Sequence, residues 1–178
     1  MPNTVSSPNP AVAQLMHHAG ISLDMNYGTT ESTCFFSELN NSFKEYFRYS
    51  LSTQGRGKLT HTDAQWDVVL RTELDAGRVV PYNGGAHIWV CDGYQTSPDL
   101  YHMNWGWGGT YNGYFAQNSL NPGSLTFSTV SCIVGLKPVG PFEVEGDSAV
   151  FGENGGTVSI EVAGDSTWAA VASAAWIT

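Results

Sequence analysis

The fold is organised around the segment Gly84-Gly85-Ala86-His87-Ile88-Trp89-Val90-Cys91-Asp92-Gly93. Its apolar and aromatic centre predicts a β-strand that is entered through a glycine turn. Residues 100–105 predict the next strand, and residues 94–99 predict the hairpin loop between the two. The pair of strands would carry His87 and Asn104 near their ends, and a histidine placed there can act as a general base.

Directly after the second strand, residues 105–109 read Trp-Gly-Trp-Gly-Gly, which cannot continue a regular strand because glycine offers no side-chain packing and favours bends. Trp105 and Trp107 on such a bend would wall a cleft. An asparagine oxygen that accepts from one imidazole nitrogen fixes the tautomer, and an indole over that contact excludes water. The letters alone leave open whether Asn104, Trp105 or Trp107 touches the ring of His87.

These residues resemble the streptopain-like cysteine peptidases, a family with a papain-like fold. The resemblance covers about residues 11–138 and is carried by GGAHIWVCDG (84–93), YHMNWGWGG (101–109), GYF (113–115), LNP (120–122) and GISLDMNYG (20–28). It implies a secreted bacterial cysteine endopeptidase that acts on protein or peptide substrates. It also implies that His87 is the catalytic histidine, that Asn104 orients it, and that Trp105 and Trp107 shield it.

The same resemblance implies two substrate contacts, at Thr33 in a polar loop and at Ala86 in the backbone that lines the substrate groove. The family usually has glycine at the position of Ala86. A methyl group there would either narrow the groove or be accommodated, since alanine replaces glycine without strain only where φ is negative.

One departure from the family is larger. The nucleophilic cysteine of the family opens a helix well before the segment that matches residues 20–28. In this sequence Cys34 follows a polar loop, Cys91 lies mid-strand and Cys132 lies in a late apolar run. We therefore expect the chain to be the C-terminal part of a peptidase domain, without the nucleophile segment and inactive alone.

The order of the expected elements is typical of an α+β fold. Helices are predicted at residues 11–19, ended by Gly20, at residues 35–49 with an apolar stripe expected to lie in the core, and after a capping box at residues 62–65, ended by Gly77. Strands are predicted at residues 79–82, 88–90, 100–103, 114–115 and 130–136. This is a partial papain-like fold, with helices first and a bent antiparallel sheet later.

Several polar residues are expected to be structural. Glu73 and Asp75 point apart on a helix and are interpreted as solvated charges. His102 is expected to pack or to face solvent. Asp92 is expected to stabilise a turn beside Gly93, because its odd spacing from His87 makes it a poor orienter.

Composition excludes some classes of function. The chain has 178 residues and a net charge of −9, which argues against nucleic-acid binding. It has no apolar run of about 18 residues that would span a membrane. Three unevenly spaced cysteines form no C-x-x-C pair, and His17 and His18 point to different helix faces, so neither a metal site nor a cofactor is expected.

The chain divides at its prolines into residues 1–138, the partial peptidase domain, a linker at residues 139–141, and residues 142–178. The last part resembles the start of a BACON-type β-sandwich, a module suspected of binding carbohydrate. It is too short for a closed sandwich, so we expect Trp168 or Trp176 to be partly exposed.

The sequence therefore predicts the histidine-bearing part of a cysteine endopeptidase. An alternative of another class stays open, namely a non-catalytic protein- or glycan-binding module on a peptidase scaffold.

Overall fold

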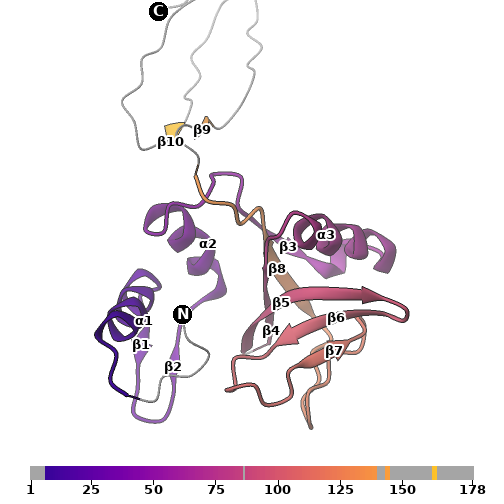
Figure 1. Cartoon of the computed structure of the whole chain (residues 1–178), viewed down its shortest axis with the longest axis horizontal. Helices are drawn as coiled ribbons and strands as arrows, with labels where there is room; N and C mark the ends of the chain where they lie inside the picture. Colours follow the sequence, from indigo (N-terminus) through magenta and orange to yellow (C-terminus); the bar gives the residue numbers. More distant parts are fainter. Residues whose placement is uncertain (1–6, 86, 140–142, 145–161, 164–178) are drawn as a thin grey trace, which may run out of the picture.

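The computed structural model describes residues 7–85, 87–139, 143–144 and 162–163. Over these residues the chain is an α+β protein, which confirms the predicted fold class. Figure 1 shows α3 against the large sheet, while α1, α2 and the β1–β2 ribbon lie together to one side of it. The elements are α1 (Pro10–Ser22), β1 (Asn26–Tyr27), β2 (Ser32–Thr33), α2 (Phe36–Glu45), β3 (Gln54–Gly57), the 3-10 turn η1 (Lys58–Thr60), α3 (Asp63–Asp75), β4 (Val80–Gly84), β5 (His87–Thr96), β6 (Asp99–Asn104), β7 (Gly113–Phe115), β8 (Val130–Val134), β9 (Glu143–Val144) and β10 (Val162–Ala163).

The large sheet has six strands in the order β3-β8-β4-β5-β6-β7, and every neighbouring pair is antiparallel. Gly84, the last residue of β4, pairs with His87, the first of β5. Gly85 follows β4 with φ +62, a left-handed conformation that favours glycine. The predicted glycine turn before His87 is therefore confirmed at Gly85.

The hairpin of β5 and β6 is longer than predicted and is interrupted by a bulge. Thr96 pairs with Asp99, so only two residues connect the strands instead of the six expected. The register shifts between Cys91 and Gly93, which leaves Asp92 without a main-chain pairing residue on β6. A bulge of one residue changes which side chains of β6 share a face with those of β5.

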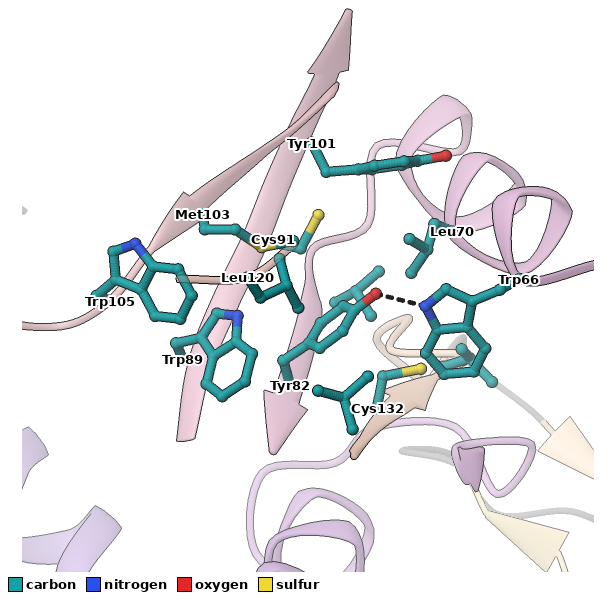
Figure 2. Packing of buried hydrophobic residues seen from close by; sticks show 13 residues of the cluster. Trp66, Leu70, Tyr82, Trp89, Cys91, Tyr101, Met103, Trp105, Leu120 and Cys132 are labelled. Atoms are coloured by element: carbon teal, nitrogen blue, oxygen red, sulfur yellow. Dashed lines mark hydrogen bonds between the residues drawn. The ribbon is translucent and has the colours of Figure 1, made fainter. Parts of the chain in front are cut away.

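The core lies between α3 and one face of the sheet (Figure 2). It is unusually aromatic, and the indole nitrogen of Trp66 donates a hydrogen bond to the hydroxyl of Tyr82 over 2.7 Å. Burying these large rings removes apolar area from water and so stabilises the domain. The largest buried side chains are Trp66, Trp89, Trp105, Tyr82, Tyr101, Leu70, Met103, Leu120 and Ile133.

Helix α3 begins at the predicted capping box. The side chain of Thr62 accepts from the amide of Gln65 over 3.3 Å, and the side chain of Gln65 accepts from the amide of Thr62 over 2.8 Å. The helix ends before Gly77, which has φ +71. Both predicted ends of this helix are confirmed, and they fix how Trp66 enters the core.

The first two helices differ from the prediction. Helix α1 continues through Gly20 to Ser22, and a side chain on the buried Gly20 would collide with the ring of Tyr27, whose hydroxyl lies 1.7 Å from an added Cβ. Gly20 thus serves close packing and does not end the helix. Helix α2 is shorter than residues 35–49, and its expected core stripe is only half-buried, with Tyr46 64% exposed.

Glu73 is also a correction, because it is buried and not solvated. Its side chain is 9% exposed and accepts two hydrogen bonds from Arg78, at 2.7 and 3.2 Å, and one from the amide of Gly135 at 2.9 Å. Asp75 is exposed and accepts from the hydroxyl of Tyr94, as a surface carboxylate can.

The predicted C-terminal module lies almost wholly outside the described residues. Within it the structure describes only β9 and β10, which pair antiparallel. The predictions for Trp168 and Trp176 fall on residues that the structure does not describe, and the boundary at residues 139–141 stays a prediction.

Candidate active site

His87 begins β5 and points to the face of the sheet that carries the core. Its Nε2 lies 2.8 Å from the main-chain oxygen of Trp105. A carbonyl oxygen can only accept, so Nε2 must carry the proton of a neutral ring. Among the described residues, Nδ1 has no hydrogen-bond partner, which leaves its lone pair available to take a proton.

Aromatic rings confine the imidazole of His87. The ring of Trp107 stacks on it with centroids 4.6 Å apart and planes 26° apart. Trp89 and Phe127 lie further away, at 6.0 and 6.1 Å. The stacked indole covers one face of the imidazole and restricts rotation of the ring.

Trp105 contributes in two ways. Its carbonyl binds His87, and its fully buried indole packs on Trp89 with centroids 4.8 Å apart. Figure 2 shows the two indoles side by side at one end of the core cluster. The core therefore anchors the residue whose main chain orients the histidine.

The structure places Asn104 differently from the predicted contact. Asn104 is exposed and pairs with Val90, whereas His87 shares a face with Trp89 and Cys91. The predicted contact between the Asn104 carboxamide and the imidazole is wrong, because the two side chains lie on opposite faces of the sheet.

Asn104 instead accepts, through Oδ1, a hydrogen bond from the amide of Gly106 over 3.1 Å. That amide belongs to the same peptide unit as the Trp105 carbonyl that binds His87. Asn104 and His87 are thus connected through one peptide group, and hydrogen bonds in such a chain strengthen one another.

Of the two residues predicted to contact substrate, one lies away from His87 and the other lies outside the described residues. Thr33 is an exposed residue of β2, where it pairs with Asn26. Figure 1 shows β2 away from β5 and β6, so the described structure does not bring Thr33 to His87. Ala86 lies outside the described residues.

A second histidine lies on the opposite face. His102 Nδ1 is 2.5 Å from a carboxylate oxygen of Asp92, the bulge residue, and its ring meets the edge of Tyr114 at 5.2 Å. His102 therefore packs locally, as predicted, and Asp92 holds the bulge by binding a side chain as well as by its place beside Gly93.

The three thiols of the chain are poor nucleophiles. Burial raises the pKa of Cys91 to about 12, and burial followed by the charge effect of Cys91 raises the pKa of Cys132 to about 12. Burial also raises the pKa of Cys34. Because the thiolate is the attacking species, none of these cysteines is prepared for attack at neutral pH.

Two residues of the site have no clear signal in the sequence. Phe127 lies in a polar loop between predicted strands, where no periodicity singles it out, yet it packs against Trp89 and His87. Asn112 precedes β7, and its Oδ1 accepts from the amide of Trp105 over 3.0 Å. The asparagine before Gly113 could only have been taken for a turn residue.

The described part of the chain contains no group of three or more His, Cys, Asp or Glu side chains that could hold a metal ion. Nor does any helix in that part have the length and apolar character needed to cross a bilayer.

Comparison with known proteins gives a consistent result. The model of the family described as the Peptidase C10 family matches residues 1–115. Streptopain of Streptococcus pyogenes is 33% identical over 140 residues, which are 72% of this chain and 35% of streptopain. Thiol protease/hemagglutinin PrtT of Porphyromonas gingivalis is 36% identical over 135 residues, which are 70% of this chain and 15% of that protein.

A solved structure agrees with these sequences. Active wild-type interpain A cysteine protease of Prevotella intermedia superposes with a TM-score of 0.64 at 30% identity, over 71% of this chain and 56% of that chain. The chain thus spans about a third of the length of the streptopain sequences that it matches. The predicted papain-like α+β architecture is confirmed by this likeness.

Proposed function

Because the chain belongs to the peptidase C10 family of cysteine peptidases, we propose that it is the histidine-bearing part of an endopeptidase that hydrolyses peptide bonds with a cysteine nucleophile. The observation that carries this proposal is the 2.8 Å contact of His87 Nε2 with the Trp105 carbonyl. It leaves Nδ1 as an oriented base. A base fixed in one tautomer is what thiol activation requires.

The proposed reaction uses a thiol that Cys34, Cys91 and Cys132 do not supply, since all three have raised pKa values. Nδ1 of His87 takes the proton of that thiol, and the resulting imidazolium stabilises the thiolate. Sulfur attacks the peptide carbonyl, and Nδ1 returns the proton to the amine as the C–N bond breaks. Water then hydrolyses the acyl-enzyme with the same base.

The main chain and the indoles support His87 in this scheme. The Trp105 carbonyl accepts from Nε2 both in the neutral ring protonated at Nε2 and in the imidazolium, so the charged ring keeps its orientation. Trp107, stacked at 4.6 Å, would keep water from that bond and favour the ion pair on its other side. Asn104 would orient His87 indirectly, by holding the peptide group between Trp105 and Gly106.

We also propose substrate contacts and a location for the whole protein. Thr33 and Ala86 would contact substrate through the peptide-binding groove, and the whole protein would act outside the bacterial cell on protein substrates. The relatives come from Streptococcus pyogenes and Porphyromonas gingivalis, which supports a bacterial origin. Carbohydrate contact by a BACON-type module at residues 142–178 is a separate prediction, tested by glycan binding with and without those residues.

The decisive experiment joins this chain to an upstream segment that carries the helix-opening cysteine of the family. We expect cleavage of an unstructured peptide, and we expect His87→Ala to lower kcat/KM by about 10³-fold. His102→Ala is the matched control, because His102 lies on the other face with Asp92. Equal cleavage with and without His87, or no cleavage by the folded joined protein, would contradict the proposal.

A non-catalytic binding module is the second candidate. This function needs only the peptidase scaffold and no primed thiol among Cys34, Cys91 and Cys132. Micromolar binding of intact peptides by this chain, together with absence of cleavage by the joined protein, would support it.

A further inference from the structure

Asn112 forms a hydrogen bond with the main chain just beyond the end of the β6–β7 ladder. The β6–β7 ladder ends at the pair Met103 and Gly113. Just beyond this pair, the side chain of Asn112 accepts from the amide of Trp105 over 3.0 Å. The side chain thus takes the place of the next main-chain acceptor where the two strands diverge.

The chain between these strands has little intrinsic preference for its conformation. Gly106, Gly108 and Gly109 have φ of +77, +63 and +93, and Tyr111 has φ +62 although it is not glycine. A segment of this kind has many alternative conformations when it is not held. Something must fix the Trp105 main chain if its carbonyl is to stay 2.8 Å from His87.

Three hydrogen bonds meet at that main chain. Asn112 holds the amide of Trp105, Asn104 holds the amide of Gly106, and the carbonyl between the two amides accepts from His87. Rotation of either peptide plane would lengthen at least one of these bonds. The carbonyl can therefore turn away from the imidazole only if the hydrogen bond to Asn112 or the one to Asn104 lengthens or breaks.

We propose that Asn112 is a positioning residue for His87, which it orients through the main chain of Trp105. The inference rests on the proposed function for its catalytic meaning. Its geometric part concerns only which nitrogen of His87 carries the proton. Loss of Asn112 would leave the Trp105 carbonyl held only by the bond from the Gly106 amide to Asn104. The carbonyl would then turn away part of the time, and the imidazole would sample both tautomers.

The test uses the 178-residue chain labelled with ¹⁵N. For Asn112→Ala we expect hydrogen exchange of the Trp105 amide to become about tenfold faster, and we expect long-range ¹H–¹⁵N spectra to show a shift of His87 from Nε2–H toward Nδ1–H. Asn118→Ala is the matched control, since Asn118 is exposed and its side chain forms no hydrogen bond within the described chain. It should change neither reading.

If the alanine variant does not fold, Asn112→Asp still tests the positioning role of Asn112. A carboxylate accepts more strongly than an amide, so the Trp105 amide proton should move downfield and exchange a few times more slowly, with the His87 tautomer kept. Faster exchange without a tautomer change in Asn112→Ala would mean a structural role only and would overturn the proposal. An unshifted Trp105 amide in Asn112→Asp would overturn it as well. Neither reading depends on peptide cleavage, so this test and that of the proposed function fail separately.

Discussion

Replacing Glu73 with glutamine should destabilise the protein in a way that depends on pH. The carboxylate accepts two hydrogen bonds from Arg78 and one from the amide of Gly135. Glutamine keeps one acceptor oxygen but loses the charge and the second acceptor. Arg78 and the Gly135 amide would then compete for a single oxygen in a buried place.

The size of the effect follows from these contacts. Hydrogen bonds to charged groups are worth about 1.5–3 kcal/mol each. The Arg78 side chain is 24% exposed, so water replaces part of what it loses. We expect a net loss of about 2 kcal/mol at pH 7, which lowers the urea midpoint by about 1 M for an m value of about 2 kcal/mol/M.

The sign of the pH dependence follows from the pKa of Glu73. Burial alone raises this pKa, but hydrogen bonds from Arg78 and Gly135 and the charge of Arg78 outweigh burial and hold it below its usual value. A carboxyl with a lowered folded pKa stabilises the fold fully above its unfolded pKa of about 4.3, and this stability is lost as the pH falls through the folded pKa. The wild-type advantage should therefore be full at pH 7 and should shrink below about pH 4.

The assay is urea unfolding of both proteins at pH 7 and pH 3. Asp75→Asn serves as control, because Asp75 is exposed, and it should change stability by less than about 0.5 kcal/mol. Equal midpoints of wild type and Glu73→Gln at pH 7 would contradict a stabilising role for these three hydrogen bonds. A deficit of the same size at pH 3 would refute the charge argument while leaving a packing effect.

Two further predictions concern the site. Trp107→Ala should cost about 1 kcal/mol of stability by loss of stacking, yet lower kcat of the joined protein about tenfold because His87 is less well held; an unchanged kcat would show that the stacked ring is not needed. At pH 8 a thiol reagent should label Cys34 in the folded chain but reach Cys91 and Cys132 only after unfolding, as mass spectrometry would detect; fast labelling of either buried thiol would contradict the raised pKa values.

Local sequence signals predicted much of the fold. The capping box at Thr62 and the stop at Gly77 marked both ends of α3. The glycine turn before His87 marked the start of β5. These signals depend on a few neighbouring residues, so they can be read without knowledge of the tertiary structure.

The face of Asn104 could not be read in this way. Cys91 pairs with Met103, but without the bulge at Asp92 it would pair with Asn104. Asn104 would then share the face of His87, as the sequence analysis supposed. One extra residue in β5 moves Asn104 to the other face of the sheet relative to His87. No local pattern in the sequence predicts this bulge.

The prediction that Glu73 is solvated was wrong for a different reason. Its burial depends on Gly135, which is far away in the sequence, and on Arg78, which follows the helix. Helical spacing predicted only that Glu73 and Asp75 point apart, which holds for a buried carboxylate as well as for a solvated one.

The family resemblance implied that Asn104 orients His87, but the two side chains are not in contact. The family match is independent of this contact, and the Trp105 carbonyl takes the orienting position that Asn104 was expected to fill. The acceptor that orients His87 was expected in the side chain of Asn104, and the structure has it in the main chain of Trp105, the next residue.

The protonation site of His87 in the unmodified chain shows whether the Trp105 carbonyl orients the imidazole, and long-range ¹H–¹⁵N correlation measures it at a pH where the ring is neutral. A proton fixed on Nε2, with Nδ1 bare, is the result expected from the contact with the Trp105 carbonyl. A proton on Nδ1, or an even mixture of the two tautomers, would contradict it.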